Sequence, residues 1–314
     1  MKNIAFFIVM LFSVMTFSQE KLEEVKVESK KRGIVKSVSK ISNTSVVTSK
    51  ELLKAACCNL AESFETNPTI DVNFSDALTG TKQIKMLGLT SPYILISEEN
   101  IPSVRGASQA YGLSFTPGTW VESIQITKGA GSVVNGYESI SGQINTELIK
   151  PMKDIPFFLN AYGATDSRFE LNTHFNKRVS DYWSTSLFVH GNTRVAKNDM
   201  NDDGFLDNPL GKQINLTNRW QYTNPKSGWV TFLNLRYMKD DKQSGEINFD
   251  PDRDKLTTNY WGSEITTERI DFSSKIGYVF KDMPYQSIGF QNAFSSHNQQ
   301  SYFGLNQYDI KQQS

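Results

Sequence analysis

Two short stretches carry side chains with the spacing of metal ligands. In the first, Asp199, Asn201, Asp203 and Asp207 stand at positions 1, 3, 5 and 9 of a segment with glycine at position 6. Oxygen ligands at that spacing wrap a hard cation such as calcium. Position 12 is Leu210 instead of the glutamate that completes such a loop, so the pattern predicts a weak calcium site. An acidic surface turn without an ion is the alternative interpretation.

The second stretch holds the two cysteines of the chain, Cys57 and Cys58, which are adjacent. Adjacent thiolates can bind a soft ion such as copper(I), or they can join in a strained vicinal disulfide. Cysteines that only pack as small apolar side chains are the commoner outcome, and we favour packing here. A disulfide scaffold or a zinc ribbon needs more cysteines at set spacings, so both classes are excluded.

The sequence shows no constellation typical of an enzyme. Gly129-Ala-Gly131 lacks the G-K-[ST] that follows a phosphate-binding loop, and no Ser/His/Asp order stands out. The first of three histidines, His174, shares an alternating polar face with Arg168 and Glu170, which favours solvated lining over ligation. The chain has 33 basic and 33 acidic side chains, whereas nucleic-acid binders are usually basic. We predict neither catalysis nor nucleic-acid binding.

Residues 1–18 (MKNIAFFIVMLFSVMTFS) have the features of an export signal. A lysine precedes an apolar run over Ile4–Val14, and Thr16 and Ser18 provide small residues before Gln19. This pattern predicts a signal peptide that is cleaved after residue 18; an uncleaved N-terminal anchor is the alternative. Hydrophobic residues make up 38% of the chain and the mean hydropathy is −0.41, which excludes a protein built from several membrane-spanning helices.

Two regions of different periodicity follow a charged lead over 19–32. Residues 33–150 mix helical and strand-like runs with Gly and Pro turns, which predicts a compact α+β domain. A threonine or serine cap before apolar residues at helical spacing predicts a helix over 48–60. Alternating or β-branched runs predict strands near 70–74, 83–87, 93–96 and 121–127.

From Pro156 onward the pattern changes to a period of two. In 168–176, for example, Phe169, Leu171 and Phe175 alternate with charged and amide side chains. Apolar residues on one face and polar residues on the other match transmembrane β-strands between lipid and a wet lumen, although a soluble sandwich alternates too. The runs predict seven or eight strands, near 156–164, 167–177, 182–193, 213–222, 228–238, 267–281, 284–296 and possibly 301–308.

The connections between these runs also alternate in length. Those at 166–167 and 178–181 are tight, whereas 194–212 and 239–266 are long and polar, as in outer-membrane barrels. We therefore predict an all-β transmembrane antiparallel barrel. A barrel that encloses a folded domain needs about 22 strands, so we expect the chain to be a fragment of a longer protein.

The order of export signal, charged lead, α+β domain and barrel strands resembles that of TonB-dependent outer-membrane receptors, and so do several motifs. The lead Leu22-Glu23-Glu24-Val25-Lys26-Val27 is similar to the TonB box of that family. Gln83-Ile-Lys-Met-Leu-Gly-Leu89 with Tyr93-Ile-Leu-Ile-Ser97 resembles the "I-R-G … V-L-I-D-G-V-P" stretch of the plug domain. The segment from Val121 to Gly136, followed by Ser141-Gly-Gln-Ile-Asn145, resembles "I-E-R-I-E-V-x-K-G-P-x-S-x-x-Y-G … G-G-x-I-N".

The resemblance marks seven residues as the plug motif: Gly88, Glu122, Lys128, Gly129, Gly131, Gly136 and Gly142. Glycines 129, 131 and 136 allow positive φ after the strand that Lys128 ends. Glu122 opens that strand, where a carboxylate that meets a barrel Arg or Lys would fix the plug; a solvated edge charge is the alternative. Leu87, Ala130 and Ser97-Glu98-Glu99-Asn100 depart from the family pattern, which weakens the expectation of plug–barrel polar contacts there.

The resemblance implies import across the outer membrane of a Gram-negative bacterium. The ligand would be scarce, such as a ferric siderophore or another metal complex, and the partners would be TonB with its inner-membrane energising complex and the outer-membrane lipid. The implied organisation is a signal peptide (1–18), TonB box and linker (19–32), plug (33–150) and first part of the barrel (151–314). An exported calcium-binding β-sandwich adhesion protein is the alternative, and the plug motifs argue against a passive pore.

Overall fold

The computed structural model describes residues 34–36, 44–52, 59–65, 67–76, 78–131, 137–152, 155–283 and 285–314. All of them belong to one compact unit, 33–314. The signal peptide, the TonB-box segment, the two cysteines and Gly136 lie outside the described residues. No helix in the described ranges is long and apolar enough to cross a membrane.

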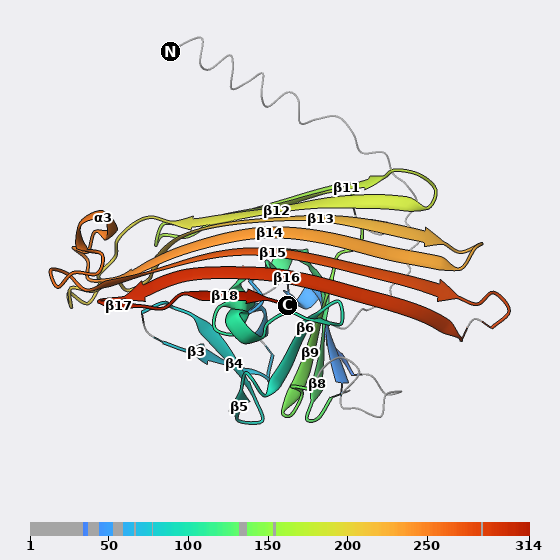
Figure 1. Ribbon diagram of the computed structural model, residues 1–314, viewed down its shortest axis with the longest axis horizontal. Helices are drawn as coiled ribbons and strands as arrows, with labels where there is room; N and C mark the ends of the chain where they lie inside the picture. The colour runs from blue at the N-terminus through green and yellow to red at the C-terminus, as the bar shows by residue number, and fades with distance from the viewer. Residues whose placement is uncertain are drawn as a thin grey trace, which may run out of the picture. The chain divides into compact units, whose positions relative to one another are not determined.

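The C-terminal half is a long antiparallel sheet in which β10 to β16 pair in chain order (Figure 1). We call it the long sheet. Its last two short strands, β17 and β18, both pair with β16. The strands are β10 (Phe157–Gly163), β11 (Arg168–Arg178), β12 (Trp183–Arg194), β13 (Leu210–Asn224), β14 (Trp229–Gly245), β15 (Gly262–Val279), β16 (Ser287–Phe303), β17 (Asn306–Gln307) and β18 (Ile310–Gln313).

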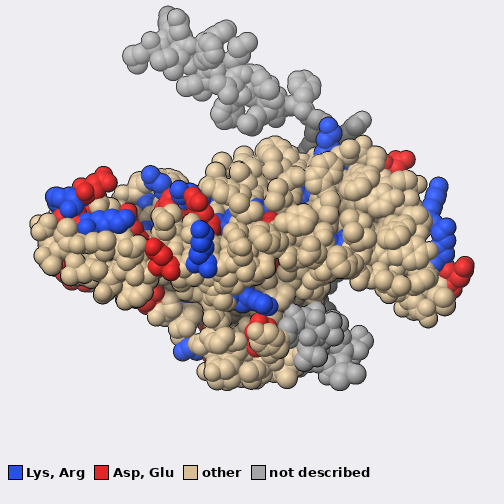
Figure 2. Space-filling model, in the orientation of Figure 1, with Lys and Arg blue, Asp and Glu red and all other residues tan. Residues whose placement is uncertain are grey.

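Burial on the long sheet is the reverse of that in a soluble protein. On β11, Phe169 and Leu171 are 56% and 49% exposed, whereas Glu170 and Asn172, which alternate with them, are buried. In a sandwich the apolar face would be the covered one. Charged side chains gather mainly toward the two ends of the long strands, and the span between them is mostly uncharged (Figure 2). The long sheet therefore has the surface of a barrel wall, with an apolar outside and a polar inside.

Some predicted strand limits were wrong. Strands β14 and β15 extend well beyond the predicted limits, so the second long connection shrinks to 246–261. The predicted strand near 301–308 does not exist as such, because β16 continues to Phe303 and a turn with Gly304 at φ +58° follows. These errors share one cause: polar residues near the strand ends obscure the alternation, while main-chain pairing with the neighbouring strand continues.

The N-terminal half, residues 34–152, forms a small domain on the inner face of the long sheet (Figure 1). Its main sheet has the order β1-β2-β8-β9-β6-β7, and β3-β4-β5 form a second sheet. The strands are β1 (Ile34–Lys36), β2 (Thr44–Thr48), β3 (Asp71–Phe74), β4 (Lys82–Met86), β5 (Leu89–Thr90), β6 (Ile94–Glu98), β7 (Ile101–Pro102), β8 (Val121–Lys128) and β9 (Gly142–Leu148).

Helical structure is sparse in the described ranges. The predicted helix over 48–60 is seen only as α2 (Ser49–Leu52), since residues 53–58 lie outside them. A further α-helix, α3 (Pro251–Asp254), lies in the second long connection of the sheet. The single-turn helices are η3 (Glu62–Phe64), η4 (Gly106–Ser108), η5 (Gly112–Ser114) and η6 (Gly118–Trp120).

The core of the small domain follows from the alternation in its central strands. Ile124 and Ile126 of β8 are fully buried, and they pack with Ile144 of β9 and Ile96 of β6. Strands β6 and β9 run parallel, whereas β8 and β9 are antiparallel. Strand β6 lies between β9 and the short edge strand β7, and the turn that follows it reaches the long sheet.

Candidate functional site

The turn between β6 and β7 presents two neighbouring carboxylates to the long sheet. Glu98 pairs with Ile101, so only Glu99 and Asn100 form the loop. Both have positive φ, 54° and 61°, as a two-residue hairpin loop with a type I′ turn requires. A left-handed conformation costs a glutamate about 1–2 kcal/mol, so its surroundings must stabilise it.

Glu99 forms a buried ion pair with Arg219 of β13. Their side chains are 6% and 1% exposed, and Nη2 of Arg219 lies 2.8 Å from Oε1 of Glu99. Arg219 also donates hydrogen bonds to the Ile149 carbonyl and to Oδ1 of Asn234, each at 2.8 Å. The Leu148 amide donates to Oε1 of Glu99 at 3.1 Å. Such a fully bonded pair is the form in which two buried charges are tolerated.

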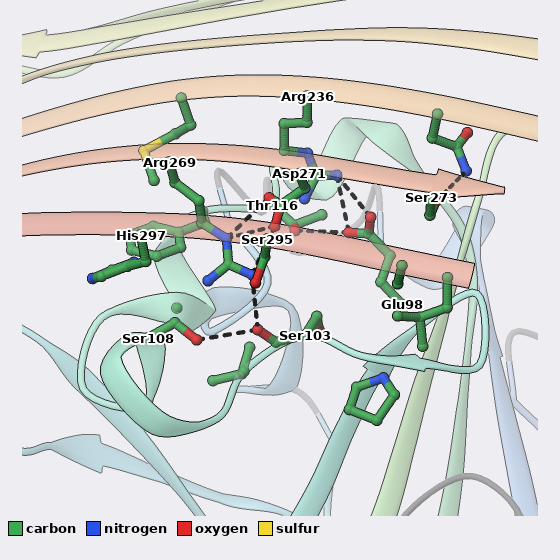
Figure 3. A pocket seen from close by; sticks show the side chains of 18 of the residues that line it. Glu98, Ser103, Ser108, Thr116, Arg236, Arg269, Asp271, Ser273, Ser295 and His297 are labelled. Atoms are coloured by element: carbon green, nitrogen blue, oxygen red, sulfur yellow. Dashed lines mark hydrogen bonds and ion pairs between the residues drawn. The ribbon is translucent and has the colours of Figure 1, made fainter. Parts of the chain in front are cut away.

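Glu98 forms a second ion pair, with Arg236 of the neighbouring strand β14. Nη2 of Arg236 lies 2.8 and 3.0 Å from the two carboxylate oxygens (Figure 3). The hydroxyl of Thr116 donates to the same carboxylate at 3.0 Å, and Nε of Arg236 donates to the Thr217 hydroxyl at 3.2 Å. Two adjacent turn residues thus hold two adjacent strands. We call Glu98, Glu99, Arg219 and Arg236 the ionic seat.

Main-chain acceptors of the small domain extend this attachment. Asn215 of β13 donates to the Phe115 carbonyl at 2.6 Å. On β15, Lys275 donates to the main-chain carbonyl of Glu99. At the far end of the sheet, the Ala107 amide donates to Oε1 of Gln312 at 2.7 Å. The long sheet therefore holds the small domain along most of its width.

A cavity of about 270 Å³ lies beside the ionic seat, between the small domain and the long sheet. Glu98 and Arg236 line it together with the Arg269–Asp271 ion pair, in which Nε of Arg269 lies 2.9 Å from both carboxylate oxygens of Asp271. His297 lies at its edge (Figure 3). The cavity is therefore bordered by charges that are already paired, and movement of the turn would enlarge it.

The charge of Glu99 makes the seat sensitive to acid. Burial by itself raises the pKa of this carboxyl, but the positive charges of Arg219 and two nearby lysines outweigh burial and hold the pKa below its usual range. A carboxylate with a lowered pKa stabilises the folded state fully above its unfolded pKa of about 4.3, and the stabilisation is lost as the pH falls through the folded pKa.

We therefore expect the seat to be insensitive to pH between about 5 and 8 and to weaken in stronger acid. The measurement is hydrogen exchange of the Leu148 amide as a function of pH, corrected for intrinsic exchange. Glu99→Gln should weaken the seat at neutral pH and abolish the additional loss in acid. An acid response of equal size in both proteins would assign it to another group.

The expected role of Glu122 is corrected by the structure. Its side chain is 44% exposed, and its ion-pair partner is Lys150 at 3.9 Å, within the small domain. Glu98 and Glu99, in the segment where the sequence departs from the family pattern, and Glu62 pair with arginines of the long sheet. Glu122 stands on β8 and pairs with a lysine of the small domain itself.

Most of the other motif residues in the described ranges lie at the end of β8, where Gly142 pairs with Lys128. Lys128 is its last residue, and Gly129 follows with φ +79°. Gly131 does not have the positive φ that we expected; it is required because a Cβ would collide with the side chains of Ser139 and Gln143. Gly142 leaves room for Met86 in the same way. Gly88, at φ +79°, forms the turn between β4 and β5.

In the 199–207 loop, main-chain amides of the loop itself donate hydrogen bonds to the carboxylates. Asp199 accepts the Gly204 amide at 2.9 Å, and Asp207 accepts the Met200 amide at 2.8 Å. Within the described ranges no three His, Cys, Asp or Glu side chains are grouped to hold a metal ion. Calcium binding here stays a prediction, and it requires the carboxylates to exchange main-chain hydrogen bonds for the ion.

If the loop binds calcium, calcium should raise the thermal stability of the protein, because a ligand that binds only the folded state stabilises it. Asp203→Ala combined with Asp207→Ala should remove that gain, while the same protein without calcium should unfold at a nearly unchanged temperature. A calcium titration of the unmodified protein that leaves the unfolding temperature constant would end the hypothesis.

Comparison with protein families places residues 37–143 in the TonB-dependent Receptor Plug Domain. The chain has the plug domain and the fold of a TonB-dependent receptor. The small domain is the plug, and the long sheet is part of the barrel wall. No curated protein sequence matches the chain.

Solved structures of TonB-dependent receptors share this arrangement at low sequence identity. The ferric-catecholate import receptor Fiu from E. coli K12, in its open form, matches with a TM-score of 0.62 and 14% identity, over 84% of this chain and 40% of Fiu. The siderophore receptor PiuA from Acinetobacter baumannii matches with 0.59 and 16%, over 83% and 37%. The copper transporter OprC matches with 0.53 and 12%, over 85% and 48%. The chain thus spans less than half of each.

Proposed function

We propose that the protein imports a scarce extracellular ligand across the outer membrane of a Gram-negative bacterium, energised by TonB. The observation that supports this most directly is the ionic seat, because a diffusion pore has no need of a folded domain held inside its wall by buried ion pairs. The inside-out burial of the wall disfavours the alternative, a soluble calcium-binding sandwich. The proposal assigns the chain a transport role and no catalytic one.

For the ligand, we propose a metal complex such as a ferric siderophore. The similar receptors support this class, since they include a ferric-catecholate import receptor, a siderophore receptor and a copper transporter. Copper(I) capture by Cys57 and Cys58 is the alternative within the same class. These cysteines lie outside the described residues, and packing remains our prediction for them.

Growth of a deletion strain on single limiting nutrients tests the proposal. Loss of growth on one iron or copper source, restored by the gene, would support it. Extraction of the protein from outer membranes only with detergent would support its location, and a freely soluble secreted product would contradict it. Copper analysis of the purified protein distinguishes the two roles of the cysteines. If they capture copper, the unmodified protein contains copper and the double variant Cys57→Ser with Cys58→Ser does not. If they only pack, neither protein contains it.

A further inference from the structure

Trp120 is a fully buried side chain of the plug at its contact with the wall. It is 1% exposed, and its ring centroid lies 5.4 Å from that of Phe188 and 6.4 Å from that of His190, both on β12. Its carbonyl accepts the Ile149 amide at 3.0 Å. The start of β8 and the residue that follows β9 are therefore fixed to each other beside the wall.

Arg236 connects this aromatic contact to the ionic seat. Its guanidinium lies 5.9 Å from the centroid of the Trp120 ring while it binds both carboxylate oxygens of Glu98. Arg236 is 9% exposed, so departure of Glu98 would leave a buried cation without its carboxylate, which is strongly unfavourable. An aromatic face can compensate part of that loss, because a desolvated cation is attracted to the electron-rich ring.

We propose that Trp120 is a positioning residue that holds Arg236 when Glu98 withdraws. The turn between β6 and β7 can then detach from the wall while β8 and β9 stay attached. The movement opens on the cavity that Glu98 and Arg236 line. A role for this detachment in transport rests on the proposed import function. The detachment itself can be measured in purified protein without transport.

Hydrogen exchange of purified protein in detergent tests the role of Trp120. Glu98→Gln is compared in three backgrounds: unmodified Trp120, Trp120→Phe and Trp120→Leu. One amide reports the turn: that of Asn100, which donates to Oδ1 of Asn145 at 2.7 Å. Amides of β8, such as that of Ile126, report the attached part. Glu98→Gln alone should accelerate exchange at the turn by about tenfold or more, because it removes a charged hydrogen-bonding partner, and should leave β8 unchanged.

The matched pair is Trp120→Phe and Trp120→Leu. Phenylalanine keeps an aromatic face, so Glu98→Gln combined with Trp120→Phe should behave as Glu98→Gln alone. Leucine is apolar but has no such face, so Glu98→Gln with Trp120→Leu should accelerate exchange at the turn and in β8 together. Trp120→Leu with Glu98 intact also leaves a cavity against Phe188 and His190, so the role of Trp120 in holding Arg236 is measured by the excess of the double variant's effect on β8 over the sum of the two single variants.

Two results would overturn the proposal. In one, Glu98→Gln alone accelerates β8 as much as the turn, which would make the plug a single cooperative unit. In the other, leucine and phenylalanine at position 120 give the same exchange pattern, which would reduce Trp120 to packing. If the leucine variant does not fold, Trp120→Met takes its place, since methionine fills irregular volume without an aromatic ring.

Discussion

Arg219→Met is expected to accelerate exchange of the Leu148 amide hydrogen by about two to four orders of magnitude. The variant leaves the carboxylate of Glu99 buried with its main ion-pair partner removed, and breaking a buried pair from one side costs about 3–5 kcal/mol. The Leu148 amide reports this directly because it donates to Oε1 of Glu99. Exchange measured by mass spectrometry at neutral pH gives the free energy of opening.

Two controls separate the ion pair from general damage. Glu99→Met with Arg219→Met removes both charges, and a pair of apolar side chains of similar volume is often as stable as a buried ion pair. Because that variant lacks the acceptor of the Leu148 amide, the readout is global stability: the double variant should unfold at a higher denaturant concentration than Arg219→Met alone. At Arg178, which is 68% exposed and pairs with the 89% exposed Asp181, methionine should cost at most about 1 kcal/mol. Equal effects at both arginines would contradict the assignment.

Val25→Pro is expected to abolish uptake of the ligand while leaving its binding at the cell surface intact. We infer that Leu22–Val27 pairs edge-on with a strand of TonB, and proline removes a main-chain donor and fixes φ. This segment lies outside the described residues, so the proposal rests on its sequence. The measurement is uptake and surface binding of the nutrient identified by the growth test.

Val25→Thr is the matched control for that variant. Threonine keeps the main-chain donor, the β-branched shape and the preference for extended structure, so uptake should stay near that of the unmodified protein. Loss of uptake in both variants would indicate that the side chain of Val25 is required instead of strand pairing. Normal uptake in Val25→Pro would remove the segment as the site of TonB contact.

Local sequence determined the strands of the wall and the centre of the plug sheet. Alternation with a period of two is a property of each strand by itself, so Phe169 and Leu171 could be assigned to one face and Glu170 to the other before any partner strand was known. The same holds for β8, whose buried isoleucines stand at alternate positions. Motif spacing likewise located the glycine turn after Lys128.

Only the tertiary structure decided which charges meet. Arg219 could be assigned to the polar face of its strand, but its partner Glu99 lies 120 positions away in the chain, and Arg236 lies 138 positions from Glu98. Sequence reasoning chose Glu122, because the family motif marks it, and discounted the β6–β7 turn, because its residues depart from the motif. Ion pairing depends on distance and burial in space, and a local pattern contains neither. The seat was decided by the pairing of β6 with β9 on one side and β7 on the other, which places the two glutamates of its turn at the wall.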